Sequence, residues 1–359
     1  MTNQANTTQT QDKKAPGWLL GLTPQMVALQ KAFYETRVKH PAMEALLEDL
    51  MPLLMPYSES NIIVLVGATG VGKSALTRVL LKTLIAEFDG LMQDDPSTVP
   101  LVAVEAYADG DRRHGFKGLY QQMIGELAEP GMGEKSPAEV SQGKVVVKPS
   151  SRTTVGALRN MVERGLKERK TRILVVDEAA HMMRFGREAA TMDTLKSIAN
   201  TSGTKIVLVG SFDLFDLIEG HGQIARRTSI LNLDRYHIDK PGDREAFRAV
   251  VQKLQAKWPS AEVPNFVAIS DELMEVSLGC VGLLKSLMLD ASAMQLKADG
   301  KWNPKFLVKA AKANGLRNVI RREIEVGESK VRDALLGQVL WDDATFSKMV
   351  HRMDAPAHA

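Results

Sequence analysis

The stretch Asn61–Leu76, N-I-I-V-L-V-G-A-T-G-V-G-K-S-A-L, decides the fold class of this chain. It begins with an apolar run, Ile62 to Val66, which is rich in β-branched side chains and does not alternate with polar residues. Such a run is typical of a strand that is buried on both faces of a parallel sheet. Because helix formers follow from Ala75 to Glu87, the stretch predicts a strand, a glycine-rich loop and a helix in that order.

The glycine-rich loop fits the pattern G-x-x-x-x-G-K-[ST], which binds phosphate groups when it joins a strand to a helix. Its glycines permit backbone conformations in which N–H groups turn inward around phosphate oxygens, at the positive end of the helix dipole. We expect Lys73 to reach the β- and γ-phosphates and the Ser74 hydroxyl to ligate Mg²⁺. The alternative is a glycine-rich turn that binds nothing, but strand, loop, Lys-Ser pair and helix all agree with phosphate binding. The expected nucleotide-binding residues are therefore Gly67, Ala68, Thr69, Gly70, Val71, Gly72, Lys73 and Ser74.

A second buried strand, Arg172 to Val176, ends in two adjacent acids, Asp177 and Glu178. We expect Asp177 to hold Mg²⁺ through the water shell of the ion. Glu178 is placed to polarise the water that attacks the γ-phosphate. The alternative is that Asp177 merely caps a following helix. The complete phosphate loop upstream favours the interpretation as a nucleoside triphosphate site.

Length and composition are those of an aliphatic, multi-domain α/β protein. The chain has 359 residues, of which 44% are hydrophobic and only 5% aromatic, enough to bury a large core in more than one domain. The single cysteine, Cys280, excludes an internal disulfide, and no stretch resembles a signal peptide or a membrane span. We expect a cytoplasmic protein with no membrane partner. The formal net charge of +3 permits a nucleic-acid partner without demonstrating one.

Predicted strands and helices alternate as far as about residue 235, and only helices follow. Further aliphatic runs at Lys205–Gly210 and Ser229–Leu233 predict strands, so the pattern indicates an α/β fold with a parallel, helix-covered sheet. We expect four segments. They are a disordered segment at 1–20, an α/β nucleotide-binding domain with N-terminal helices at 21–235, a helical lid at 236–300, and a helical tail at 301–359. The tail either docks on the core or binds a partner.

Three later positions are similar to motifs of AAA+ proteins. Ser211 ends a strand at the place of sensor 1, a polar residue that contacts the attacking water or the γ-phosphate. Arg226 and Arg227 precede the last predicted strand. In AAA+ proteins this is the position of the arginine finger, which reaches the nucleotide of a neighbouring subunit. The alternative is that both are ordinary surface charges, and the sequence does not distinguish between the two arginines. Lys285 lies where sensor 2 would begin, but the usual residue there is arginine, so an ordinary helix lysine is the alternative.

The chain resembles the transposition AAA+ ATPases of the TnsC, TniB and MuB type from about residue 22 to 296. The resemblance rests on the phosphate loop, Asp177-Glu178-Ala-Ala-His181, Lys205–Ser211, Ile224–Leu233 and Gly279–Lys285. It implies a protein that binds ATP and polymerises as a ring or helical filament around double-stranded DNA. Such proteins connect a target-selection protein of the TniQ type to a DDE-type transposase, which performs the DNA chemistry. His181 is expected to pack or cap at the end of the strand rather than to take part in catalysis.

Two other functions are compatible with these motifs. A replication-type AAA+ initiator or helicase loader shares every nucleotide motif, and a P-loop signalling NTPase would bind a protein instead of DNA. An ABC transporter ATPase is disfavoured, because the chain has no L-S-G-G-Q signature.

Two basic segments, residues 111–117 and 148–154, precede predicted helices. In the family that the chain resembles, such segments line the central DNA channel, where cations and helix N-terminal amides neutralise phosphates with little sequence specificity. The alternative is that these cations are surface charges and that Ser151 or Thr153 only caps the next helix. The expected DNA-binding residues are Arg112, Arg113, Lys117, Arg152 and Thr153.

Overall fold

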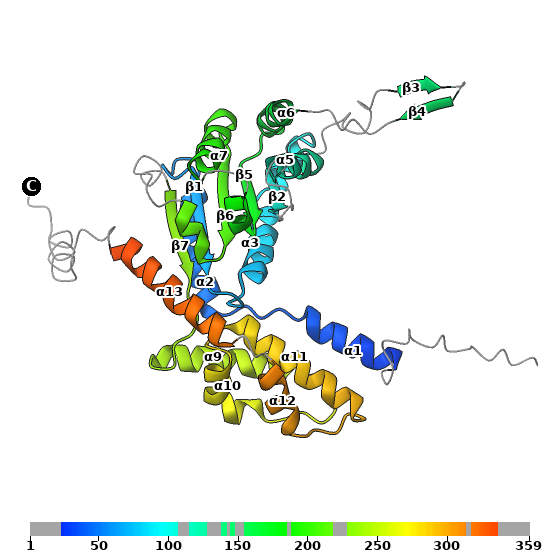
Figure 1. Ribbon diagram of the computed structural model, residues 1–359, viewed down its shortest axis with the longest axis vertical. Coiled ribbons are helices and arrows are strands. Elements are labelled where there is room, and N and C mark those ends of the chain that lie inside the picture. Colours follow the sequence, from blue (N-terminus) through cyan, green and yellow to red (C-terminus); the bar gives the residue numbers. More distant parts are fainter. Residues whose placement is uncertain are drawn as a thin grey trace, which may run out of the picture. The chain divides into compact units, whose positions relative to one another are not determined.

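A five-stranded parallel sheet forms the centre of one compact unit (Figure 1). The computed structural model describes residues 23–106, 115–127, 138–141, 144–147, 154–184, 188–217, 228–313 and 317–336. The strand order is β2-β5-β6-β1-β7, so β6 lies between β1 and β5. The strands are β1 (Ile62–Gly67), β2 (Leu101–Glu105), β5 (Ile173–Asp177), β6 (Lys205–Gly210) and β7 (Thr228–Leu233).

The burial of the central strands β1 and β6 explains why their sequences are almost continuously apolar. Every residue of β1 and of β6 is buried, as the non-alternating pattern predicts for central strands. Val66 pairs with Gly210 of β6, and Gly67 pairs with Leu233 of β7, so these parallel strands end at one common edge. The predicted α/β class with a parallel, helix-covered sheet is confirmed.

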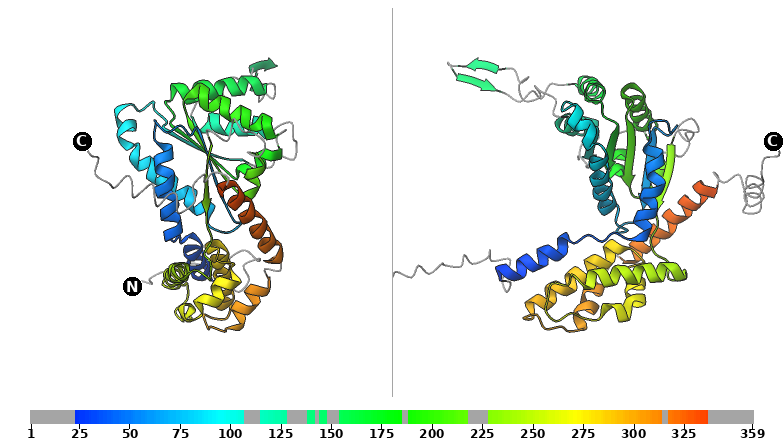
Figure 2. Two further views of the ribbon diagram at one scale, coloured as in Figure 1. Left: turned by 90° about the vertical axis from the view of Figure 1, so that its left-hand side faces the viewer. Right: turned by 180° about the vertical axis from the view of Figure 1, so that it is seen from behind.

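Helices cover both faces of the sheet, with α3 on one face and α7 on the other (Figure 2). Right-handed crossovers give this arrangement because the connection from β1 to β2 runs in one direction along the sheet and the later connections run in the other. The helices of this unit are α2 (Pro41–Leu54), α3 (Lys73–Glu87), α4 (Asp89–Asp94), α5 (Gly115–Glu126), α6 (Val155–Glu168), α7 (Glu188–Ser202) and α13 (Arg317–Leu336), with the short 3₁₀ turns η2 (Ala179–Arg184) and η3 (Phe212–Leu217). A separate antiparallel hairpin pairs β3 (Ala138–Ser141) with β4 (Lys144–Val147).

In the part of the chain that the structure describes, the second compact unit contains helices and no strands. It consists of α1 (Pro24–Glu35), α9 (Pro241–Gln255), η4 (Phe266–Ile269), α10 (Ser270–Val276), α11 (Val281–Lys297) and α12 (Lys305–Ala313). Its core contains an aromatic cluster in which Trp258 meets Phe266 at a ring-centroid distance of 4.7 Å and Phe33 at 5.5 Å. Because Phe33 lies on α1, this N-terminal helix belongs to the core of the helical unit.

The two units therefore do not follow the linear order that the sequence suggested. The helical unit includes α1, from before the sheet, and α12, from beyond residue 300, while α13 belongs with the sheet. Within the described ranges, no helix is long and apolar enough to cross a membrane.

Candidate nucleotide-binding site

The phosphate loop joins the end of β1 directly to the start of α3. Gly70 has a φ of 78° and Gly72 a φ of 124°, backbone conformations that side chains disfavour, so glycine is required at both turns. Gly72 is the N-cap of α3 and supplies no side-chain hydrogen bond to the helix. The first-turn N–H groups of this 15-residue helix therefore have no side-chain cap, and such N–H groups form a site for anions.

The Lys73 ammonium group lies inside this loop. Its Nζ donates hydrogen bonds to the carbonyl oxygens of Gly67, at 2.8 Å, and Ala68, at 3.0 Å. The side chain is half-buried, whereas Ser74 at the next position is exposed. The loop thus holds the Lys73 charge at its centre and exposes the Ser74 hydroxyl, as the phosphate-binding pattern predicts.

The paired acids lie at the end of β5. Asp177 Oδ1 accepts a hydrogen bond from the backbone N–H of Glu178 at 2.9 Å, and both acids are half-buried. This bond goes to the next residue, whereas an N-cap would bind the second or third N–H of the following helix. Glu178 has a φ of 50°, in the left-handed region, which costs an L-residue about 1–2 kcal/mol. Such an outlier in a carboxylate at a strand end motivates a functional role.

Ser211 follows β6 directly and so lies between the phosphate loop and the acids. Its hydroxyl donates to Asp213 Oδ2 at 3.2 Å. The end of the strand is closely packed: a Cβ at Gly210 would lie 2.9 Å from Leu214 Cδ1 and 3.2 Å from the backbone nitrogen of Ala180. The position expected for sensor 1 between the two motif strands is therefore present, and a contact with nucleotide stays a prediction.

The oxygen ligands present at this edge suit a hard cation. The Ser74 hydroxyl and the Asp177 carboxylate are the ligand types that Mg²⁺ prefers when it also binds phosphate oxygens. They come from the first turn of α3, which follows β1, and from the end of β5; β1 and β5 are strands of one parallel sheet. The donor set fits Mg²⁺ bound together with a nucleotide.

Two residues near the loop were missed by sequence reasoning. Glu323 on α13 accepts a 2.6 Å hydrogen bond from the Thr69 hydroxyl, although the two residues are 254 positions apart. His40, the buried N-cap of α2, has its Nε2 4.0 Å from where a Cβ at Gly72 would lie. Local periodicity contains no signal for either contact, because both depend on how distant segments pack.

Several expected site residues lie outside the described residues. They are the DNA-binding candidates Arg112, Arg113, Arg152 and Thr153 and the arginine-finger candidates Arg226 and Arg227.

Of the expected DNA-binding residues, Lys117 is described; it lies half-buried in the first turn of α5. Neither Ser151 nor Thr153 is the N-cap of α6. The N-cap is Thr154, whose Oγ1 accepts from the N–H of Ala157 at 3.2 Å.

Lys285 has a structural role within the helical unit. Its Nζ donates to the carbonyl oxygens of Tyr34 and Thr36, at 2.6 and 2.5 Å, and so satisfies carbonyls at the C-terminal end of α1. The proposed contact of Lys285 with the γ-phosphate stays a prediction.

Comparisons with known proteins agree with this geometry. Residues 57–218, which include the phosphate loop, the acids and Ser211, match the family described as AAA domain. The chain has the fold of an AAA+ P-loop NTPase. No curated protein sequence matches it significantly.

Two solved structures from Aeropyrum pernix share this AAA+ fold. One is the ORC1 protein in complex with DNA, with 18% identity and a TM-score of 0.53 over 79% of this chain and 69% of that chain. The other is the ORC2 protein in its ADPNP-ADP complexes, with 16% identity and a TM-score of 0.53 over 79% of this chain and 71% of that chain. At such low identities the likeness concerns the fold.

Proposed function

We propose that this AAA+ chain binds ATP with Mg²⁺ and hydrolyses it. The observation that carries the proposal is that the Lys73 loop, Ser211 and the two acids follow the carboxyl ends of β1, β6 and β5, which are neighbours in one parallel sheet. Nucleotides bind at this edge in open α/β sheets, because helix N-termini and strand ends converge there.

Each residue has a distinct part in the proposed reaction. Lys73 exchanges its bonds to the loop carbonyls for bonds to the β- and γ-phosphates, and Glu178 accepts a proton from the attacking water. Ser211 orients that water or the γ-phosphate. When bound, Mg²⁺ neutralises charge on the phosphate oxygens, and Ser74 and Asp177 are the residues that would hold it. Arg226 or Arg227 would complete the site from a neighbouring subunit.

The proposed biological role is assembly on double-stranded DNA in the regulation of transposition. ATP binding would drive the chain into a ring or filament on target DNA, and hydrolysis would disassemble it. The assembly would connect a target-selection protein of the TniQ type to a transposase. The motifs shared with the TnsC, TniB and MuB type support this role, as do the basic segments around Arg112 and Arg152.

A replication-type initiator or helicase loader is the second candidate. The observation that favours it is the fold shared with an ORC1 protein that was solved in complex with DNA. Gene neighbourhood separates the two candidates: an adjacent DDE transposase gene supports the transposition role, and an adjacent replication gene supports the alternative.

Assembly on DNA is tested by negative-stain microscopy and co-sedimentation of the full chain. The samples contain ATP, ADP or no nucleotide, each with and without linear duplex DNA. We expect rings or filaments only with ATP, and more of them with DNA. A chain that stays monomeric and unbound to DNA in all six samples would contradict both DNA-based roles and favour a signalling NTPase.

A further inference from the structure

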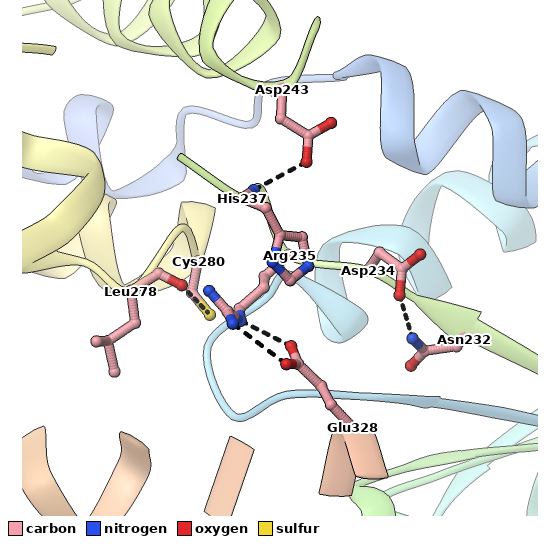
Figure 3. A network of polar contacts seen from close by, with 8 residues as sticks. All are labelled: Asn232, Asp234, Arg235, His237, Asp243, Leu278, Cys280 and Glu328. Atoms are coloured by element: carbon pink, nitrogen blue, oxygen red, sulfur yellow. Dashed lines mark hydrogen bonds and ion pairs between the residues drawn. The ribbon is translucent and has the colours of Figure 1, made fainter. Parts of the chain in front are cut away.

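Helix α13 makes polar contacts with the phosphate loop and with other segments of the sheet unit. Glu323 accepts from the Thr69 hydroxyl of the phosphate loop at 2.6 Å. Glu328 pairs with Arg235, just beyond β7, through two bonds of 2.7 and 3.2 Å (Figure 3). A third pair joins Lys330 to Asp216 of η3 at 2.6 Å. The helix is thus attached to the phosphate loop itself and to two segments that follow strands of the sheet.

One face of α13 is packed against the sheet unit and the other is solvated. Ile324 and Val331 are seven residues apart, and only 2% and 5% of their surfaces are exposed to solvent. Gly327, between them, lies against Phe212 of η3 so closely that an added Cβ would be 2.0 Å from the ring. The opposite face is solvated and includes Glu325, Ser329 and Arg332. The spacing is that of a docked amphipathic helix.

The contact of Glu323 with Thr69 lies beside a cavity. A space of about 540 Å³ separates part of α13 from η3, and Phe212, Asp213, Asn318, Arg322 and Glu323 are among its lining residues. Near the phosphate loop, α13 is therefore held by the hydrogen bond between Thr69 and Glu323 at the edge of this cavity as well as by close packing. Breaking this bond would leave the core of the sheet unit intact.

The charge of Glu323 conflicts with a bound triphosphate. Thr69 lies in the phosphate loop, where a nucleoside triphosphate would bring several negative charges next to a carboxylate. The Glu323 carboxylate and the phosphates repel each other because both are negatively charged. The Thr69 hydroxyl has one proton to donate, so it cannot donate to Glu323 and to a phosphate oxygen at the same time.

We propose that α13 is a nucleotide-responsive gate on the phosphate loop, a proposal that rests on the proposed ATP binding. When docked, the helix holds Glu323 on Thr69 and lowers the affinity for triphosphate. When ATP binds, it weakens the docking of α13. By thermodynamic linkage, docking of α13 lowers the ATP affinity by the same factor by which bound ATP weakens the docking of α13.

Calorimetric titration of the full chain with ATP and with ADP tests the gate. Glu323→Gln removes the charge but keeps an oxygen that accepts from Thr69. We expect this variant to bind ATP about threefold to tenfold more tightly, the size of effect that one nearby like charge supplies at partial exposure. The gain for ADP should be smaller, because ADP carries one phosphate fewer. The matched control Glu325→Gln makes the same charge change on the exposed face and should leave both affinities unchanged.

Hydrogen exchange of the wild-type chain supplies a measurement that needs no variant. Amides of residues 320–332 should exchange faster with a non-hydrolysable ATP analogue than without nucleotide. Unchanged exchange, or equal ATP affinities of wild type, Glu323→Gln and Glu325→Gln, would overturn the gate while leaving ATP binding intact. If no nucleotide binds to any of the three chains, the proposed function falls and the gate falls with it.

Discussion

At Lys73, one residue in one loop carries most of the expected recognition of phosphate. In this structure its ammonium group bonds to the carbonyl oxygens of Gly67 and Ala68, so the cation lies within the loop. A preplaced cation needs little rearrangement to meet the phosphates, which favours binding.

Replacing Lys73 with alanine should reduce ATP affinity by at least about tenfold and abolish ATP-dependent assembly. The variant removes the one cationic side chain of the phosphate loop, so the β- and γ-phosphates lose the point charge that neutralises them. Calorimetric titration with ATP measures the loss. Lys82→Ala, an exposed lysine on the same helix, is the matched control and should bind as wild type. Wild-type affinity in Lys73→Ala would rule out the phosphate-loop assignment.

Glu178 should separate ATP binding from ATP hydrolysis. Glu178→Gln keeps the size of the side chain but removes the base, so the variant should bind ATP, hold long-lived assemblies on DNA and turn over at least about a hundredfold more slowly. A phosphate-release assay measures the rate, with the exposed Glu126→Gln on α5 as the control. Turnover at the wild-type rate would show that Glu178 is not the base.

At the scale of the helices, α5 carries a titratable group, the phenol of Tyr120, into the core beside α6. Tyr120 on α5 is almost completely buried, and burial raises the pKa of its phenol from 10.0 to about 12. Arg159 and Glu163 of α6 act on this pKa in opposite directions. The interface between the two helices therefore disfavours the phenolate.

This raised pKa predicts that stability depends on pH under alkaline conditions. Because the folded pKa lies above the unfolded value, Tyr120 contributes stability that is complete below pH 10 and is lost as the pH rises toward about 12. The full loss is at most about 3 kcal/mol. Urea unfolding between pH 8 and 11 should show wild type losing more stability than Tyr120→Phe.

The exposed Tyr57 serves as the control for this pH dependence. Tyr57→Phe should follow the wild-type profile at every pH. Parallel profiles for wild type and Tyr120→Phe would contradict the burial of an un-ionised phenol.

At the scale of the whole molecule, the proposed DNA contacts predict a common salt dependence. Replacing Arg112, Arg113, Lys117 or Arg152 singly with alanine should weaken DNA binding about equally for any sequence. Each lost phosphate contact should flatten the slope of log K against log salt by about one unit. Fluorescence anisotropy at several salt concentrations measures the slope, with Lys82→Ala as the control. Unchanged slopes in all four variants would exclude these cations from the DNA interface.

The arginine pair Arg226 and Arg227 is expected to affect hydrolysis and assembly and not the binding of ATP. With Arg226 and Arg227 both replaced by alanine, each subunit should still bind ATP, but hydrolysis and ATP-driven assembly should fail, because the finger acts on the nucleotide of a neighbouring subunit. Titration and negative-stain microscopy of the same preparation separate the two properties. Normal hydrolysis in the double variant would show that both arginines are ordinary surface charges.

Much of the candidate site could be predicted because its pattern is local. The strand, the glycines and the Lys-Ser pair of residues 61–76 constrain one another over a few positions, and every residue of β1 is buried as expected. The acids at the end of β5 were predicted for the same reason. Spacing along the chain also located α3, which begins two residues before the expected Ala75 and ends at the expected Glu87.

By itself, the sequence determined the elements and the chemistry of the phosphate loop, since periodicity and backbone preference act between near neighbours. Only the tertiary structure decided which distant segments meet. It places α1 in the helical unit through Phe33 and Trp258, and α13 on the phosphate loop through Glu323 and Thr69. Both pairings depend on packing between segments more than 200 residues apart, which the local spacing of residues does not encode.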